Sequence, residues 1–294
     1  MNRTDERCKH SRQAMPSSGT KPMENKMIAA RLRKVAEDEN IAVFGIGSAA
    51  EMADEQPGHR PEDLLPGAQS LICFGVPFPR GVYQMPIHGT ETVWRSQNLY
   101  YRRLDNLALL FAQMLEESGA DAVPIYGCMP LGMSERGTVV GYLNQIRMGE
   151  LTGIGAVGRN GLLVHSRYGS RLMLGGVVTT AILPTMRYPV MDEPGCPPDC
   201  RICEEACPVN AIMADKKQVK IMKCLGYTAK TAYMSRLKFL YLRVRNKEAA
   251  ARYLSISSFD EHTLHKCSRC VALCRHDHSS RQPSPNKAWA TPKN

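Results

Sequence analysis

Eight of the eleven cysteines in this 294-residue chain lie in its last third, and this clustering constrains the fold more than any other feature. The total is odd, and the charged N-terminal residues precede no apolar stretch of the kind found in export signals. A disulfide scaffold is therefore disfavoured, because a reducing cytosol does not maintain such bridges. We expect a cytoplasmic protein whose cysteines bind metal or take part in redox chemistry.

The first cysteine group reads Cys196-Pro-Pro-Asp-Cys200-Arg-Ile-Cys203-Glu-Glu-Ala-Cys207-Pro208. Its last three cysteines are separated by two and then three residues and end in Cys-Pro, which matches the end of a bacterial ferredoxin motif. In that motif the closely spaced thiolates bind one [4Fe-4S] cluster, and the Cys-Pro cysteine binds the second. The first gap here has three residues instead of two, so the loop is one residue longer.

The second group, Cys267-Ser-Arg-Cys270-Val-Ala-Leu-Cys274, repeats the spacing of two and three residues but has one cysteine fewer. Cys224 is the obvious source of the missing ligand, and the count then reaches eight ligands for two four-iron clusters. Crosswise pairing predicts two ligand sets, which are Cys196, Cys200, Cys203 and Cys274 for one cluster and Cys207, Cys224, Cys267 and Cys270 for the other.

Zinc is the alternative, since two Cys-x-x-Cys pairs can also form a four-cysteine structural site. The three-residue spacing, the Cys-Pro pair and the two interlocked sets of four favour iron–sulfur clusters. The other three cysteines have no predicted role. Cys73 lies in an apolar run and is expected in the core, Cys128 lies in a loop, and Cys8 lies in a polar tail.

The residues before the cysteines predict an α+β fold. Apolar spacing and turn residues indicate alternating helices and strands, so we expect a layered α/β sheet core followed by the cluster domain. The expected helices are 27–39, 97–118 and 135–151, and the expected strands are 41–46, 70–76, 122–126, 162–164 and 174–183. The predicted organisation is a disordered tail over 1–22, the core over 23–190, the two-cluster domain over 191–278 and a polar tail over 279–294.

Gly153, Gly155 and Gly158 have the spacing of a dinucleotide-binding fingerprint. That motif follows a strand and opens a helix, with an acidic residue at a strand end about 20 positions later. Here the preceding residues look helical, and no such acidic residue follows. Dinucleotide binding is therefore weakly indicated.

Four segments together with the cysteine layout resemble the epoxyqueuosine reductase family, whose relatives include the reductive dehalogenases. They are Pro61–Ser70, Gly153–Leu163, Tyr168-Gly-Ser170 and Leu174-Gly-Gly176. The resemblance implies a nitroreductase-like core that holds a base-off corrinoid (cobalamin) and receives electrons from two [4Fe-4S] clusters. In the tRNA enzyme, the corrinoid reduces the epoxide of epoxyqueuosine to give queuosine.

The resemblance also implies roles for particular residues. Gly158, Arg159 and Asn160 match a Gly-Lys-Asn segment and are expected to contact the corrinoid, as is Ser170 in the following Gly-Ser turn. The alternative is a tight loop that connects two strands and needs glycine. The proton-donating Asp of the family corresponds to Val139, and valine cannot donate a proton. The catalytic residue is therefore unknown, and His165 is expected to be structural.

Positive charge is concentrated in one segment, where residues 216–252 contain eleven Lys or Arg against one acid, Glu248. Within it, residues 227–254 predict a basic helical hairpin. Three interpretations remain, in order of preference: a solvated face beside anionic clusters, a docking site for an acidic electron donor such as flavodoxin or ferredoxin, and a tRNA-binding surface. No membrane span is expected, since the longest uncharged apolar run, Leu172–Leu183, has 12 residues.

Two classes of function follow. The first is an enzyme, a reductase that passes electrons through two clusters to a buried and corrinoid-dependent site. The second is a ferredoxin-type electron-transfer module that has lost the corrinoid and catalysis. Val139 favours the module, whereas the glycine loop and Ser170 favour the enzyme.

Overall fold

The computed structural model describes residues 22–85, 89–127, 132–133, 139–188, 195–230, 233–247, 249–250, 264–265 and 267–274. The tails expected over 1–22 and 279–294 lie outside the described residues, except for Pro22. Cys8 and Cys128 also lie outside them.

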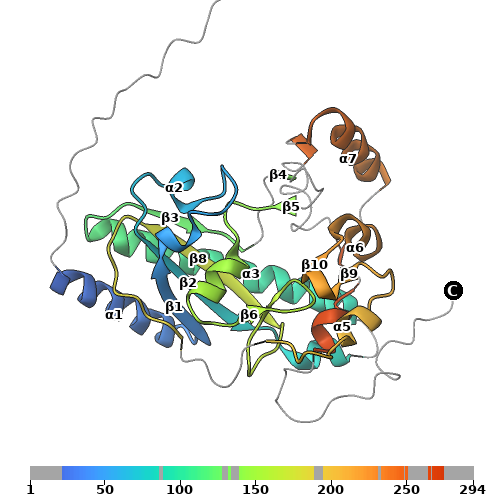
Figure 1. Ribbon diagram of the computed structural model, residues 1–294, viewed down its shortest axis with the longest axis horizontal. Coiled ribbons are helices and arrows are strands. Elements are labelled where there is room, and N and C mark those ends of the chain that lie inside the picture. The colour runs from blue at the N-terminus through green and yellow to red at the C-terminus, as the bar shows by residue number, and fades with distance from the viewer. Residues whose placement is uncertain are drawn as a thin grey trace, which may run out of the picture.

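A four-stranded antiparallel sheet forms the centre of the fold, in the order β1-β2-β8-β3 (Figure 1). The strands are β1 (Val43–Ser48), β2 (Ser70–Pro77), β8 (Leu172–Thr179) and β3 (Ala122–Ile125). Strand β3 forms one edge, where Pro124 costs the sheet little because a backbone N–H is not needed on the outer side.

Both faces of the sheet are covered, which explains why β2 is almost entirely apolar. Ile72 and Phe74 point into the core formed with the helices α1 (Pro22–Asp38) and α3 (Gly89–Glu117). Leu71 and Cys73 alternate to the opposite face, where Met148 of helix α4 (Gln145–Leu151) covers them. Successive residues of a strand point to opposite faces, so a strand buried on both sides is apolar throughout. The prediction that Cys73 is a core residue is confirmed.

Shorter elements connect this core to the cysteine segments. Before β8 they are η1 (Ala49–Met52), α2 (Pro61–Leu64), η2 (Arg80–Gln84), β4 (Gly132–Met133), β5 (Val139–Val140), β6 (Ala156–Val157) and β7 (Leu163–Val164). After β8 they are α5 (Ile202–Glu205), β9 (Ile212–Met213), η3 (Ala214–Lys216), β10 (Gln218–Val219), α6 (Ile221–Thr228), β11 (Ala229–Lys230), α7 (Tyr233–Arg245), β12 (Leu264–His265) and α9 (Arg269–Ala272).

The structure confirms a mixed helix and sheet fold and corrects the helix expected over 135–151. In the segment expected to form a helix over 135–151, the strand β5 comes first and α4 begins only after Asn144. Asn144 caps this helix by accepting a hydrogen bond from the Arg147 N–H at 3.2 Å, and such a cap sets a start that apolar spacing does not show. The segment 227–254, expected to form a helical hairpin, contains among its described residues the end of α6, β11, the helix α7 and further helical residues at 247 and 249–250, so the hairpin stays a prediction.

The glycine-rich stretch lies in the hairpin of β6 and β7, with no helix between the two strands. A dinucleotide-binding motif instead joins a strand to a helix, so this geometry differs from that of the motif. None of the described helices has both the length and the apolar character that crossing a bilayer requires.

Candidate metal centre

Four cysteines from separate parts of the sequence line one cavity. Cys196 and Cys200 lie in the loop before α5, Cys203 lies within α5, and Cys274 follows α9. They share the cavity with Asn160, Val164 and Ile202. The cavity therefore joins the β6–β7 hairpin of the core to both cysteine groups.

The other four cysteines form a second group of electrostatic neighbours. Cys270 lies in α9, and the four thiols that disfavour its ionised form are those of Cys203, Cys207, Cys224 and Cys267. The thiol of Cys224, in α6, is affected in the same way by Cys267 and Cys207. Cys203 of the first group is among the thiols that raise the pKa of Cys270, so the two groups adjoin.

Of the eight cysteines Cys203 is buried and the other seven are half-buried, and this burial changes the acidity of several of the thiols. Burial first, and then the neighbouring Cys196, Cys200 and Cys274, raise the pKa of Cys203 to about 11. Burial and the second group of cysteines raise the pKa of Cys270 to about 12. Apolar surroundings and nearby thiolates both disfavour a further negative charge. A bound cation would reverse this preference, since metal ligation deprotonates cysteine.

The two groups of neighbours coincide with the two ligand sets that crosswise pairing predicts. Within the described part of the chain, no three Cys, His, Asp or Glu side chains are grouped so that they could hold a single metal ion. The first four sulfur atoms instead surround a shared space. That these cysteines bind clusters stays a prediction.

The loop between β6 and β7 lies directly against the first cysteine group. The backbone N–H of Arg159 donates a hydrogen bond to Cys196 Sγ at 3.3 Å. Gly158 permits this approach, because a Cβ on it would come within 2.3 Å of Val164 Cγ2 and 3.4 Å of Cys196 Sγ. In the second group, the Ala211 N–H donates to Cys207 Sγ at 3.2 Å.

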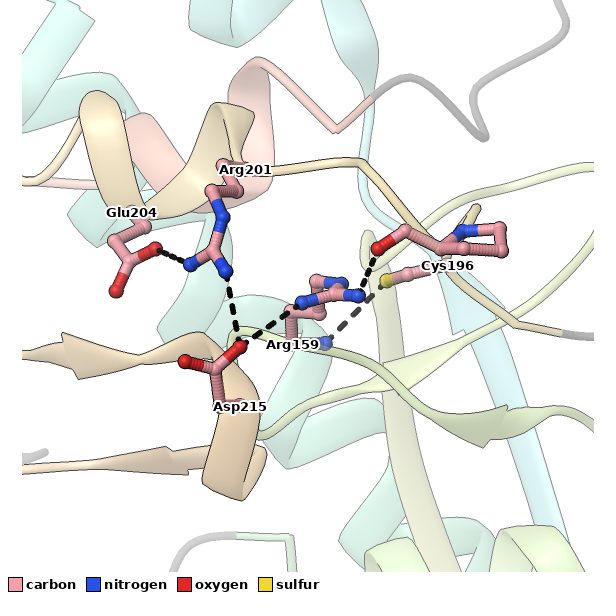
Figure 2. A network of polar contacts seen from close by, with 6 residues as sticks. Arg159, Cys196, Arg201, Glu204 and Asp215 are labelled. Carbon is pink, nitrogen blue, oxygen red and sulfur yellow. Dashed lines mark hydrogen bonds and ion pairs between the residues drawn. The ribbon is translucent and has the colours of Figure 1, made fainter.

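Arg159 also joins this loop to the cysteine segment through its side chain (Figure 2). The guanidinium donates to the carbonyl oxygen of Pro198 and forms an ion pair with Asp215 at 3.6 Å. Asp215 accepts in addition from Arg201 at 3.1 Å. Sequence reasoning missed this network, because Asp215 lies outside the motifs, Arg201 is a spacer residue between Cys200 and Cys203, and only the fold places the two beside residue 159.

Asn160 and Ser170, the other predicted corrinoid contacts, differ in whether their side chains have hydrogen-bond partners. Asn160 is 4% exposed, and its amide donates to the Cys270 carbonyl oxygen at 3.4 Å while its Oδ1 accepts from the Leu162 N–H at 3.2 Å. Ser170 is also 4% exposed, but among the described residues its Oγ has no hydrogen-bond partner. The structure thus brings residues 158–160 to the cysteines and leaves one buried hydroxyl at Ser170.

Gly158→Ala is expected to weaken binding at the first cysteine group. The added Cβ overlaps Val164, so the loop has to move away from Cys196, and overpacking of this kind costs about 1–3 kcal/mol. We expect the iron content of the anaerobically purified variant to fall toward half of the wild-type value. Gly226→Ala is the matched control, because nothing lies within 4 Å of a Cβ at that position in α6. Equal iron content in the two variants would contradict the prediction.

His165, considered as a ligand and expected to be structural, lies in a turn beside the hairpin. Its Nδ1 accepts from the Arg167 N–H at 2.9 Å, and its ring stacks on Tyr168 with 4.9 Å between centroids. The side chain is 4% exposed. Burial, with a smaller contribution from Arg167, lowers the pKa of His165 to about 4. These contacts give the neutral ring a structural role.

The lowered pKa of His165 predicts a pH dependence of stability. The folded protein binds a proton here only near pH 4, whereas the unfolded chain does so below about pH 6.5. The unfolded state therefore binds more protons in this window, so the free energy of unfolding falls as pH decreases, by roughly 3 kcal/mol at pH 4. Denaturant titrations at pH 7 and pH 5 should show this component in the wild type and not in His165→Asn. The same loss in both proteins would contradict the assignment.

No family model matches the chain, but curated relatives do. The epoxyqueuosine reductase of Lactococcus garvieae is 24% identical over 238 residues, which cover 70% of this chain and 62% of that protein. The epoxyqueuosine reductase of Synechocystis sp. is 30% identical over 167 residues, which cover 56% of this chain and 53% of that protein. The chain thus spans about half to three fifths of the length of the curated relatives it matches.

Solved structures of epoxyqueuosine reductases share the fold of this chain. The epoxyqueuosine reductase of Streptococcus thermophilus superposes with a TM-score of 0.52 at 19% identity, covering 87% of this chain and 68% of that one. A crystal structure of epoxyqueuosine reductase with an epoxyqueuosine-modified tRNA-Tyr stem loop gives a TM-score of 0.53 at 17% identity, covering 86% of this chain and 66% of that one. The resemblance noted in the sequence is confirmed.

Proposed function

We infer that this chain, a relative of the epoxyqueuosine reductases, is an iron–sulfur oxidoreductase that binds two [4Fe-4S] clusters and passes electrons to a buried reductive site. The observation that carries this inference is the convergence of eight cysteines into two adjoining groups of four. A four-cysteine zinc site needs all its sulfur atoms about 2.3 Å from one ion. Sulfur atoms that surround a common cavity suit a polynuclear cluster better.

The chain supports this chemistry by excluding water and donating hydrogen bonds. When bound, [4Fe-4S] clusters supply one-electron transfer at potentials set by burial, nearby charge and hydrogen bonds to sulfur. The buried Cys203 and the half-buried Cys270 limit solvent access to the two sites. The Arg159 and Ala211 N–H groups each donate to one cysteine sulfur. The electrostatic effect of Cys203 on Cys270 supports two adjoining sites between which an electron could pass.

The predicted corrinoid contacts fit their cofactor less well than the cysteines fit the clusters. The side chains of Arg159 and Asn160 are engaged by Pro198, Asp215 and the Cys270 carbonyl, so among the four predicted contacts only the Ser170 hydroxyl is buried without a partner. We therefore derive no step through a corrinoid. Reductive removal of an epoxide oxygen takes two electrons and two protons and releases water, and two one-electron carriers would match that demand.

A ferredoxin-type electron-transfer module is the second candidate. Two observations favour it, the valine at position 139, where the family has its proton-donating Asp, and the engagement of Arg159 and Asn160 at the cysteine cavity. In this function the chain would relay electrons to another protein and would need no proton donor.

Two partners suit the basic segment. Lys238, Arg243 and Arg245 of α7 are exposed, and so are Lys216 and Lys217 beside the first cysteine group. An acidic electron donor of the flavodoxin or ferredoxin type would be attracted by this charge, which speeds encounter. A tRNA is the other partner, because basic surfaces bind phosphates and the relative with the same fold was crystallised with a tRNA stem loop.

Cobalamin binding separates the two functions. The anaerobically purified protein with full iron content is mixed with cobalamin, and the absorption spectrum and bound fraction are measured. The reductase is expected to bind it base-off, with weaker binding for Ser170→Ala than for Ser118→Ala, a control whose hydroxyl bonds the Leu115 carbonyl oxygen. Intact clusters without cobalamin binding would exclude the corrinoid reductase and support the module.

A further inference from the structure

Arg159 contacts the first cysteine group through both its backbone and its side chain (Figure 2). Its N–H donates to Cys196 Sγ, and its guanidinium donates to the carbonyl oxygen of Pro198, two residues further along the same loop. The side chain is only 17% exposed. A positive charge is therefore held beside the cysteine cavity, in surroundings from which most water is excluded.

The counter-charge of Arg159 lies in a different environment. Asp215 is 75% exposed and is shared between Arg159 at 3.6 Å and Arg201 at 3.1 Å. Arg201 is 48% exposed and also pairs with Glu204 at 2.8 Å. Because water screens exposed charges more strongly than buried ones, Asp215 offsets only part of the effect of Arg159 on the cavity.

We propose that Arg159 is a positioning residue for the cluster bound by Cys196, Cys200, Cys203 and Cys274, and that its charge raises the reduction potential of that cluster while Asp215 lowers it. This inference rests on the proposed iron–sulfur function. Reduction adds one electron to the cluster and makes or breaks no bond, so the site becomes more negative by one charge. A nearby cation stabilises the reduced state more than the oxidised state, and an anion does the opposite.

The opposite effects of Arg159 and Asp215 on the reduction potential distinguish this electrostatic role from a purely structural one. If Arg159 only held the loop in place, removing Asp215 would either leave the potential unchanged or loosen the site. If the charges act on the cluster, Arg159→Gln lowers the midpoint potential and Asp215→Asn raises it. Arg159→Lys keeps the charge and should remain near the wild type.

The test is a redox titration with dithionite, followed by EPR, of the anaerobically purified full chain. We expect Arg159→Gln to reduce the equilibrium constant for one-electron reduction of the first cluster about threefold to tenfold, where tenfold corresponds to 59 mV. Asp215→Asn should shift it in the opposite direction by less. Arg33→Gln is the matched control, since it removes one positive charge from the ion pair with Glu37 on α1, at the far end of the molecule from α5 (Figure 1).

An unchanged midpoint in Arg159→Gln with normal iron content would overturn the inference and leave the iron–sulfur function intact. If Arg159→Gln does not assemble the first cluster, Asp215→Asn decides, because it leaves the contacts of Arg159 with Cys196 and Pro198 in place. A raised midpoint in that variant supports the proposal, and an unchanged or lowered midpoint contradicts it. Wild-type protein without iron would instead contradict the proposed function itself.

Discussion

Replacing Cys274 with alanine is expected to remove about half of the iron and inorganic sulfide from the protein. The loss should affect the cluster assigned to Cys196, Cys200 and Cys203, although Cys274 lies some 70 residues further along the chain and next to Cys270 in the second motif. The reason is geometric, since the thiol of Cys274 lines the same cavity as those three cysteines. EPR of the reduced variant should then show the signal of a single cluster.

The complementary variant makes this prediction specific. Cys267→Ala removes a ligand of the second group, which neighbours Cys224 and Cys270, so it should abolish the other signal. Cys73→Ala is the control for loss of a thiol, because Cys73 is fully buried in the sheet core, away from both groups. If Cys274→Ala and Cys267→Ala lose the same signal, the ligands follow sequence order and the crosswise assignment is wrong.

Removal of iron is expected to unfold the first cysteine segment while the sheet core stays folded. In residues 195–228 the buried apolar side chains, apart from Cys203, are only Ala211, Ile212 and Ala214. So small a core offsets little of the entropy lost on ordering the chain, and a bound metal commonly supplies the rest in such segments. The sheet has its own cores on both faces and needs no such support.

Hydrogen exchange measures this difference directly. After anaerobic chelation, backbone amides in 202–228 should exchange at least about tenfold faster, which corresponds to a loss of about 1.4 kcal/mol of local stability. Amides of β2, β8 and α3 should keep their protection, and they serve as the internal control. An equal loss of protection in the core and in the cysteine segment would contradict the account.

The sequence predicted the parts of this fold that depend on local patterns. The strand at 70–76 has an apolar run whose length matches a strand buried on both faces, and β2 spans Ser70–Pro77. Ligand spacing, which short loops constrain strongly, predicts the two sets of four cysteines, and that partition stays a prediction. The helix expected over 135–151 was wrong at its start because a single cap, Asn144, decides where α4 begins.

Contacts between distant segments lay beyond the reach of the sequence. Nothing in the local pattern of residues 158–160 indicates that Arg159 meets Cys196 and Asp215, since those contacts arise only when the β6–β7 hairpin packs against the cysteine loop. The resemblance assigned this loop to a corrinoid, and that assignment stays a prediction. The roles of Ser170 and of the basic helix α7 also depend on molecules that the sequence does not specify.

The most direct test of the central claim is metal analysis of the anaerobically purified protein, combined with its visible and EPR spectra. The account predicts a brown protein with about eight iron atoms and eight inorganic sulfides per chain, the content of two [4Fe-4S] clusters, and an EPR signal that appears on reduction. A colourless protein that contains zinc and lacks inorganic sulfide would contradict it.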